Sequence, residues 1–286
     1  MKQFIRYIFH QAAVKWHYSL LFILCNSLSI QCSNGKKDSA TDLNNTEKQY
    51  EYIQGAITRG NTDTKEIALV FTGDEYADGA DQIVNILKKR EVQGSFFFTG
   101  NFFRNPLFKK SIQSLVEDGH YIGAHSDSHL LYCDWIKRDS LLITKEEFEN
   151  DLLANYREME RFGIRKQSAP YFLPPYEWYN DSISGWTNAL GLQLINFTQG
   201  TLSHADYTTP SMVNYRSCEE IYASIVDFEK KNKVGLSGFI LLIHLGTSPE
   251  RTDKCYSYLE KLIPELQSNG YGFARIDELL TGDKPH

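Results

Sequence analysis

Short apolar runs alternate with longer amphipathic segments along residues 66–286 of this 286-residue chain. Short, uninterrupted apolar runs are typical of parallel strands that are buried on both faces. Turn-forming or polar residues separate these runs from the segments that follow. We therefore predict seven strands, at Ile67–Phe71, Ser95–Thr99, Tyr121–Ala124, Ser168–Phe172, Gln193–Phe197, Phe239–Ile243 and Gly272–Ile276.

Helical periodicity fills the intervals between these strands. In the first such segment, Ile83, Ile86 and Leu87 fall on one face. Several segments end near glycine, as at Gly163 and Gly191, which favours left-handed caps. The predicted helices are Ala80–Arg90, Pro106–Asp118, Lys145–Phe162, Ser182–Leu190, Cys218–Lys231 and Thr252–Asn269. This alternation indicates an α/β fold and favours a barrel, whole or incomplete, over a two-domain chain.

The amino-terminal segment has the features of an export signal. Basic residues up to Lys15 precede an apolar stretch too short to remain as a membrane-spanning helix. The stretch ends at Cys32 and turns polar at once, which resembles a bacterial lipoprotein signal over residues 1–31 with Cys32 lipidated. The alternative is an ordinary cleaved signal, in which Cys32 is incidental. Either interpretation places the protein in the periplasm or at the cell surface, and the first anchors it to a membrane.

Residues 32–65 are polar and are predicted to form a flexible tether to a domain over residues 66–286. Loss of the three basic residues in the signal would change the net charge from −6 to −9. The chain also has no basic run beyond Lys-Lys pairs, so nucleic acid is excluded as a partner. Cys133, Cys218 and Cys255 remain, and their spacing neither predicts a zinc site nor selects a disulfide pair.

Three polar positions follow directly on predicted strands. His125 and His129 are four residues apart just after one strand, and Asp74 follows another. Because the carboxyl ends of parallel barrel strands face one site, we expect these side chains to meet there. Two histidines and one carboxylate leave open coordination positions, as a catalytic metal requires. His244 ends a third apolar strand and is predicted to lie at the same end of the barrel. A histidine in that position can also be a core residue.

Several segments together resemble the polysaccharide deacetylase family, also called carbohydrate esterase family 4. Its His-Ser/Thr-x-x-His motif is present at His125–His129. Its first motif, Thr-Phe-Asp-Asp-Gly, is represented by the residues around Asp74. The segment Phe172–Tyr176 is similar to its Arg-x-Pro-Tyr motif, and Leu242–His244 to its Leu-x-His motif. The resemblance covers residues 66–280.

The resemblance implies a distorted (β/α)7 barrel of the glycoside hydrolase/deacetylase type. It implies one divalent metal, usually Zn²⁺, held by Asp74, His125 and His129, and hydrolysis of acetyl groups on an acetylated glycan. N-acetyl groups are favoured over O-acetyl groups on family grounds. The metal would polarise the acetyl carbonyl and lower the pKa of water, and His244 would be the general acid.

Two departures from the family motifs concern the catalytic base. Gly73 occupies the position before the metal-binding Asp, where the family has its base, and Leu173 replaces the arginine that orients it. Glu75, Asp78 and Asp127 are near enough in sequence to substitute, and the spacing does not choose among them. Each could equally be a solvated loop carboxylate.

Aromatic residues near these motifs suggest a glycan-binding cleft, because sugar rings stack on flat aromatic faces. Pro175, Tyr176 and Trp178 are the predicted substrate-binding residues, and His204 and Asp206 are expected at the rim. Two other hypotheses stay open. One is a glycan-binding surface lipoprotein that keeps the metal without turnover, which the changes at Gly73 and Leu173 favour. The other is a structural metal barrel, although structural sites usually have four protein ligands.

Overall fold

The structure is a computed structural model that describes residues 50–281. The predicted signal over residues 1–31 and the lipidation site Cys32 lie outside the described residues. Within residues 50–281, no helix has the length and apolar character needed to cross a membrane.

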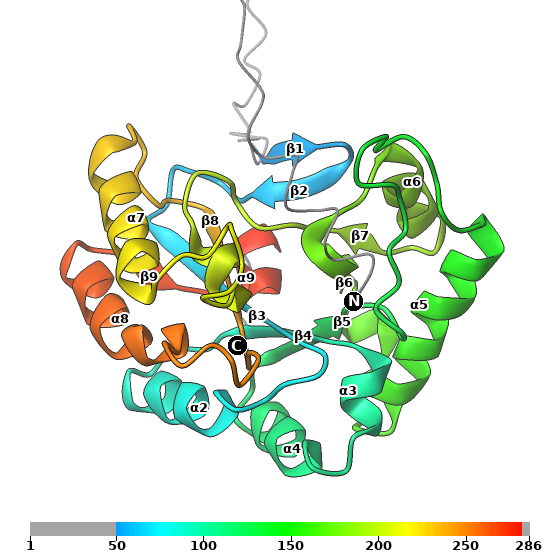
Figure 1. Cartoon of the computed structure of the whole chain (residues 1–286), viewed down its shortest axis with the longest axis horizontal. Helices are drawn as coiled ribbons and strands as arrows, with labels where there is room; N and C mark the ends of the chain where they lie inside the picture. Colours follow the sequence, from blue (N-terminus) through cyan, green and yellow to red (C-terminus); the bar gives the residue numbers. More distant parts are fainter. Residues whose placement is uncertain (1–49, 282–286) are drawn as a thin grey trace, which may run out of the picture. The chain divides into compact units, whose positions relative to one another are not determined.

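A sheet of parallel strands forms the centre of the domain (Figure 1). In space, β8, β3, β4, β5, β6 and β7 lie side by side in that order, and β9 pairs with the start of β3. The seven strands are β3 (Glu66–Gly73), β4 (Ser95–Phe98), β5 (Tyr121–Ala124), β6 (Tyr171–Phe172), β7 (Gln193–Leu194), β8 (Phe239–His244) and β9 (Gly272–Phe273). All seven correspond to predicted strands, so the distorted (β/α)7 barrel is confirmed.

Helices surround these strands in Figure 1. They are α2 (Ala80–Lys89), α3 (Gly100–Arg104), α4 (Lys109–Glu117), α5 (Lys145–Glu160), α6 (Asp181–Ala189), α7 (Cys218–Lys231), α8 (Leu259–Ser268) and α9 (Ile276–Thr281). Four short 3-10 turns are η1 (Lys166–Ser168), η2 (Pro175–Glu177), η3 (Ser203–Tyr207) and η4 (Cys255–Tyr258). Two of these turns, η2 and η3, contribute to the site described below.

An antiparallel hairpin of β1 (Glu51–Ile53) and β2 (Ala56–Arg59) extends the sheet beside β8. The chain after β7 returns to this side, because Asn196 N–H donates to the Ile57 carbonyl and Thr198 N–H to the Ile240 carbonyl, at 2.9 and 3.0 Å. These bonds help to close the barrel. The tether predicted over residues 32–65 is therefore too long, since residues 51–59 are strands of the folded domain.

The strands are apolar on both faces because both faces are covered. All residues of Ile67–Phe71 in β3 are fully buried, as are Phe239–Leu242 in β8. On α2, Ile83 and Leu87 supply the buried stripe that covers the sheet. The apolar runs in the sequence thus reflect burial inside a barrel rather than alternating exposure.

Several predicted boundaries shift for local reasons. Ser168 belongs to η1, so the strand predicted from Ser168 begins at Tyr171, and α8 begins at Leu259 instead of Thr252 because η4 precedes it. The strand predicted over Gln193–Phe197 ends at Leu194, and the strand predicted over Gly272–Ile276 ends at Phe273. The left-handed caps are confirmed at Gly163 and Gly191, with φ of 79° and 72°. The sequence pattern did not predict α3 or α9, which have five and six residues.

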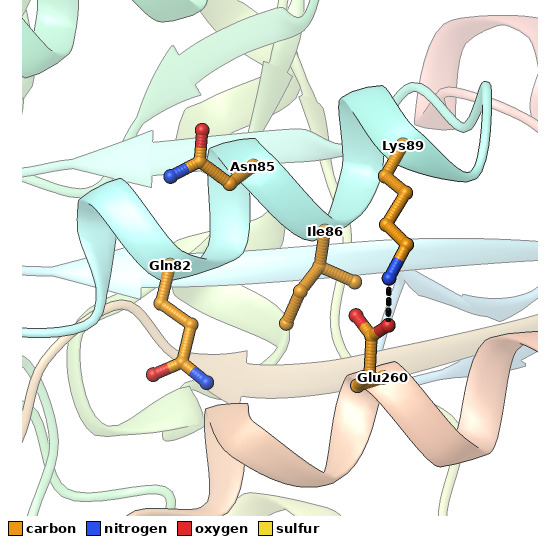
Figure 2. Close-up of a pocket in the computed structure, with 5 residues that line it drawn as sticks. All are labelled: Gln82, Asn85, Ile86, Lys89 and Glu260. Atoms are coloured by element: carbon orange, nitrogen blue, oxygen red, sulfur yellow. Dashed lines mark hydrogen bonds and ion pairs between the residues drawn. The ribbon is translucent and has the colours of Figure 1, made fainter.

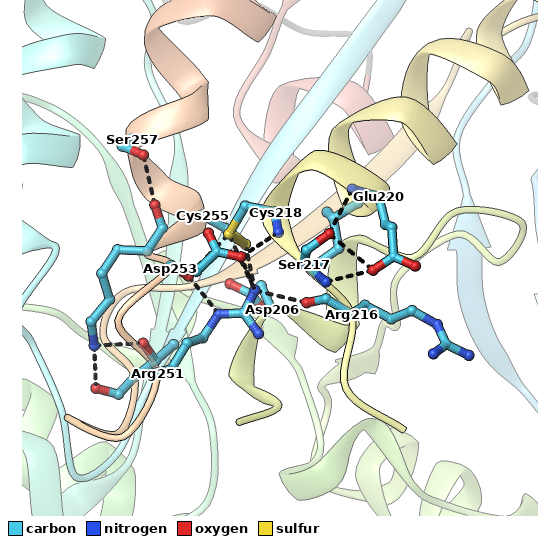
Figure 3. The surroundings of a disulfide bond; sticks show 12 residues. Asp206, Arg216, Ser217, Cys218, Glu220, Arg251, Asp253, Cys255 and Ser257 are labelled. Atoms are coloured by element: carbon cyan, nitrogen blue, oxygen red, sulfur yellow. Dashed lines mark hydrogen bonds and ion pairs between the residues drawn. A yellow bond between two sulfur atoms is a disulfide. The ribbon is translucent and has the colours of Figure 1, made fainter. Parts of the chain in front are cut away.

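A disulfide joins Cys218, the first residue of α7, to Cys255, the first residue of η4 (Figure 3). This resolves a pairing that the spacing had left open. Cys133 is buried with a free thiol. The disulfide lies next to η3, one of the two turns that contribute to the candidate site.

Candidate active site

His125 and His129 lie on a loop that directly follows β5, at the carboxyl end of the barrel. Two buried polar side chains of α5 fix this loop: Asn155 Oδ1 accepts from His125 N–H at 2.9 Å, and Asp151 Oδ1 accepts from Ser128 N–H at 3.0 Å. His129 adopts a positive φ of 53°, a conformation that is costly for a residue with a side chain. The loop is therefore held in one specific shape.

The hydrogen bond at His125 determines which ring nitrogen is available. Its Nδ1 lies 2.8 Å from the Leu173 carbonyl oxygen, so Nδ1 carries the proton and Nε2 keeps its lone pair. The rings of His125 and His129 are 5.1 Å apart between centroids. Burial, assisted by nearby imidazoles, lowers the pKa of His125 to about 3 and that of His129 to about 4. Both are neutral at neutral pH, as metal-binding imidazoles must be.

Asp74 follows the carboxyl end of β3 and is partly buried. Thr99 Oγ1 donates a hydrogen bond to Asp74 Oδ1 at 2.7 Å, and the Asp74 charge acts on His125. The donor chemistry of the two histidines and this carboxylate fits a divalent metal. However, within residues 50–281 no three His, Cys, Asp or Glu side chains are gathered closely enough to form a complete ligand set. The ligand assignment therefore stays a prediction.

His244 ends β8 and is paired with a buried carboxylate. Asp206 in η3 accepts from His244 N–H at 2.8 Å through one oxygen and contacts His244 Nδ1 at 2.6 Å through the other. Burial acts to lower the pKa of His244, but the charge and hydrogen bond of Asp206, with a contribution from Glu177, outweigh it and raise the pKa above its ordinary value. This is the environment of an imidazole kept protonated to act as an acid.

Asp206 is deeper in the protein than the sequence analysis expected. It was placed at the rim with His204, but it is 1% exposed and lies beneath His244. His204 is partly buried and stacks on Phe197, with ring centroids 4.6 Å apart. The available signal was an Asp in a loop of small residues after a parallel strand, which is too common a feature to identify a catalytic partner.

Comparison with known sequences points to one family. The sequence model described as polysaccharide deacetylase matches residues 59–195, which include Asp74, His125 and His129. A peptidoglycan-N-acetylglucosamine deacetylase of Bacillus cereus is 26% identical over 217 residues, covering 76% of this chain and 88% of the relative. The peptidoglycan-N-acetylmuramic acid deacetylase PdaA of Bacillus subtilis is 25% identical over 243 residues, covering 85% and 80%. The chain belongs to the polysaccharide deacetylase family.

Solved structures of family 4 carbohydrate esterases share the fold. Bacillus subtilis PdaA superimposes with a TM-score of 0.61 at 23% identity, covering 81% of this chain and 87% of that one. A protein of Bacillus anthracis described as a pseudoenzyme of the same family gives 0.61 at 19% identity, covering 80% and 69%. A mutant of that pseudoenzyme is described as having restored enzymatic activity. The shared fold thus occurs in active and inactive proteins.

Two of the candidate bases have structural roles. Asp78 accepts from Thr247 N–H and Tyr256 O–H at 2.8 and 3.0 Å and forms an ion pair with Lys254 at 2.8 Å. Burial acts to raise the pKa of Asp78, but these partners outweigh it and hold the pKa below its usual range. Asp127 pairs with Arg104 through both oxygens, at 2.6 and 3.1 Å. These bonds correct the proposed roles, because both carboxylates are already engaged.

The remaining candidate base, Glu75, is exposed in the loop after β3, and its charge acts on Tyr176. The interpretation of Gly73 also changes. A Cβ added at Gly73 would lie 3.0 Å from carbons of both Phe98 and Phe102. Position 73 therefore faces aromatic packing between β4 and α3, and a carboxylate there would be directed into that packing.

Aromatic side chains gather beside His129. The Tyr176 ring lies 4.4 Å from the His129 ring and 5.5 Å from Trp135, and Trp135 lies 5.6 Å from Trp178. All three aromatic side chains are partly exposed, so they can contact a sugar ring, and one face of Trp178 is covered by the Arg138 guanidinium at 4.2 Å. Pro175 is buried, which corrects its assignment as a substrate-binding residue. It shapes the turn that presents Tyr176.

One cavity of the described residues lies between two helices and is not lined by any of the predicted site residues. It has a volume of about 550 Å³ between α2 and α8 and is lined by Gln82, Asn85, Ile86, Lys89 and Glu260 (Figure 2). Lys89 and Glu260 form an ion pair across it at 2.5 Å. A smaller cavity of about 20 Å³ borders Asp206 and the disulfide. Neither cavity contains the predicted metal ligands.

Proposed function

We propose that this domain is a metal-dependent hydrolase that removes acetyl groups, N-acetyl in preference to O-acetyl, from an acetylated glycan. The observation that carries the proposal is the pairing of the partly exposed His244 with the buried Asp206 at the carboxyl end of the barrel, where Asp74, His125 and His129 are the predicted metal ligands. A surface that only binds a glycan has no need for an imidazole whose pKa is raised by a buried carboxylate. Peptidoglycan and chitin, which appear in the names of curated relatives, are candidate substrates.

The residues divide the chemistry between them. Asp74, His125 and His129 would hold a divalent metal, most suitably Zn²⁺ given two imidazole ligands and one carboxylate, and this metal would polarise the acetyl carbonyl. His244 donates a proton to the departing nitrogen, and Asp206 keeps its imidazole oriented and protonated. Tyr176, Trp178 and Trp135 supply aromatic faces for the sugar. The Leu173 carbonyl fixes the His125 tautomer.

Acetate release from N-acetylated oligosaccharides, with and without a chelator, tests this proposal. Wild type should release acetate and should lose activity on chelation. His244→Ala should keep its metal content and its affinity for the oligosaccharide and lose about 10²–10⁴-fold in turnover, the usual contribution of general acid catalysis. Equal turnover by the two proteins at matched metal loading would remove His244 from the mechanism.

A second function, glycan binding without turnover, is favoured by two observations. Leu173 stands where the family motif has arginine, and the structural relatives include a pseudoenzyme. In that case acetylated oligosaccharides would bind at the aromatic residues and no acetate would be released. Calorimetric binding without acetate release by wild type, over a panel of acetylated glycans at full metal loading, would select this function.

We further propose that the protein is exported and that Cys32 is its lipidated amino terminus, in the periplasm or at the cell surface. The support is the basic start, apolar stretch and polar turn in the sequence. The Cys218–Cys255 disulfide fits an oxidising compartment. Cys32→Ser should move the protein from the membrane fraction to the soluble fraction. An unchanged membrane fraction would contradict anchoring through Cys32.

A further inference from the structure

Glu177 occupies an unusual backbone position at the end of η2, the turn that follows β6 at the carboxyl end of the barrel. Tyr176 and Glu177 both have positive φ, 60° and 52°, a left-handed conformation that costs roughly 1 kcal/mol or more for each residue with a side chain. The turn is held from both ends, because Glu177 N–H donates to the Pro174 carbonyl and Asn196 Nδ2 donates to the Glu177 carbonyl. The fold keeps a glutamate where glycine would fit with less strain.

This turn presents consecutive side chains to the two halves of the site. Tyr176 packs on His129, with ring centroids 4.4 Å apart, on the side of the predicted metal ligands. The carboxylate of Glu177 interacts electrostatically with His244, the proposed general acid, and with its partner Asp206. Among residues 50–281, no hydrogen bond or ion pair engages that carboxylate. It therefore has no structural task that would explain the strained backbone.

The chemical state of Glu177 suits proton transfer. Burial raises the pKa of Glu177 to about 7; the charge of His244 acts to lower it, and that of Asp206 to raise it. A general base works best when its pKa is near the working pH, because it is then both available and strong enough to take a proton. Glu75 is exposed, and Asp78 and Asp127 are engaged in ion pairs. Of these carboxylates, Glu177 alone combines an electrostatic interaction with His244 and the absence of a hydrogen bond or ion pair within residues 50–281.

We infer that Glu177 is the general base of this site, an inference that rests on the proposed deacetylase function and completes it. Glu177 takes a proton from water as the water oxygen forms a bond to the acetyl carbon. The tetrahedral intermediate then collapses: the carbon–oxygen double bond re-forms, the carbon–nitrogen bond breaks, and the nitrogen takes the proton of His244. The products are acetic acid and the free amine. Transfer of the proton from Glu177 to His244 through solvent restores both residues.

Two substitutions in the full chain test this role. Glu177→Gln keeps the size of the side chain and removes the base, and Glu177→Gly removes the carboxylate and relieves the positive φ. Both should lose about 10²–10⁴-fold in kcat for acetate release while keeping metal content and KM. Glu177→Gly should be at least as stable to urea as wild type, since glycine tolerates this backbone. Added formate or azide should restore part of its kcat by accepting the proton. Glu160→Gln, an exposed carboxylate change at the end of α5, is the matched control.

The results separate this inference from the function on which it rests. Full kcat in Glu177→Gln at matched metal loading, with active wild type, would overturn the base assignment alone. The base assignment also fails if both variants lose metal and stability together and small anions restore nothing, because that is the pattern of a structural residue. Failure of wild type to release acetate from any acetylated glycan would overturn the proposed function and the base role with it.

Discussion

Asp206 binds His244 twice, through the backbone N–H at 2.8 Å and the imidazole Nδ1 at 2.6 Å. One carboxylate therefore fixes both the end of β8 and the orientation of the ring it carries. The carboxylate is itself 1% exposed, so its charge is screened little by water. The same contact that orients His244 also raises its pKa, and the two effects can be separated by mutation.

Asp206→Asn should shift the pH dependence of turnover. The asparagine oxygen can still accept from His244 N–H, but its amide N–H₂ would then face Nδ1, and the negative charge is lost. The pKa of His244 should fall. An acid acts while it is protonated, so activity is present below the pKa of His244 and is lost as pH rises through it. The alkaline limb of kcat/KM should therefore move to lower pH, with about a 10²-fold loss near neutral pH.

The control for this experiment is the circular dichroism spectrum and metal content of Asp206→Asn, which should match wild type. An alkaline limb that stays in place in the variant would show that another group controls it. In that case the raised pKa of His244 would have no part in turnover.

Support for Asp206 comes from the disulfide region. Arg251 is fully buried, and its guanidinium donates to the carbonyls of Thr208 and Arg216, which follow η3 (Figure 3). The same group contacts Cys218 Sγ and Cys255 Sγ at 3.2 and 3.0 Å. The disulfide and the arginine together tie the chain after Asp206 to α7 and η4.

Removal of the disulfide should destabilise the domain. The bond links residues 37 positions apart, and closing a loop of that size typically stabilises the folded state by about 2–4 kcal/mol. Reductant should lower the free energy of unfolding by that amount and should reduce acetate release as Asp206 loosens. The double variant Cys218→Ala, Cys255→Ala should be equally destabilised and insensitive to reductant. Reductant sensitivity that persists in the double variant would show that another cysteine is responsible.

Metal binding is expected at one site in the mouth of the barrel. Purified wild type should contain about one divalent ion per chain, and the triple variant Asp74→Ala, His125→Ala, His129→Ala should contain almost none. The two histidines are neutral and Nε2 of His125 is free to bind, as the Leu173 hydrogen bond requires. Elemental analysis measures the content, and His244→Ala is the control that removes a neighbouring imidazole. Wild-type metal content in the triple variant would show that the ligands lie elsewhere.

The sequence predicted the barrel well because its strands are buried on both faces. The limits of β5 and α7 coincide with the predicted Tyr121–Ala124 and Cys218–Lys231. In the first case a short apolar run is bounded by polar residues, and in the second Ser217 and Glu220 form a capping box. The hairpin of β1 and β2 was missed because its residues look like the polar segment before it, and their burial comes from contacts with β8 and the chain after β7.

The site was predicted less completely than the fold. The motif residues Asp74, His125, His129 and His244 could be singled out as candidates because each directly follows or ends an apolar strand. Asn155, Asp151, Asp206 and Glu177 lie on a helix or in short turns, and the interactions that distinguish them are long-range ones that no local pattern records. Glu177 in particular is distinguished by its backbone conformation, which cannot be read from residue type.

Gly73→Asp provides a last test, because it would place a carboxylate directly before Asp74, as in the family motif. The added Cβ would lie 3.0 Å from carbons of Phe98 and Phe102, whose rings stack with centroids 4.2 Å apart. Contacts this close require the aromatic rings to move, and such overpacking typically costs about 1–3 kcal/mol. The carboxylate would also be directed toward these rings, away from His244. We therefore expect a lower free energy of unfolding and no increase in acetate release.

Urea denaturation and acetate assays measure both quantities, and Gly73→Ala serves as the control that adds the Cβ without charge. A gain in turnover for Gly73→Asp over both wild type and Gly73→Ala would contradict this geometry and would place the missing base at position 73.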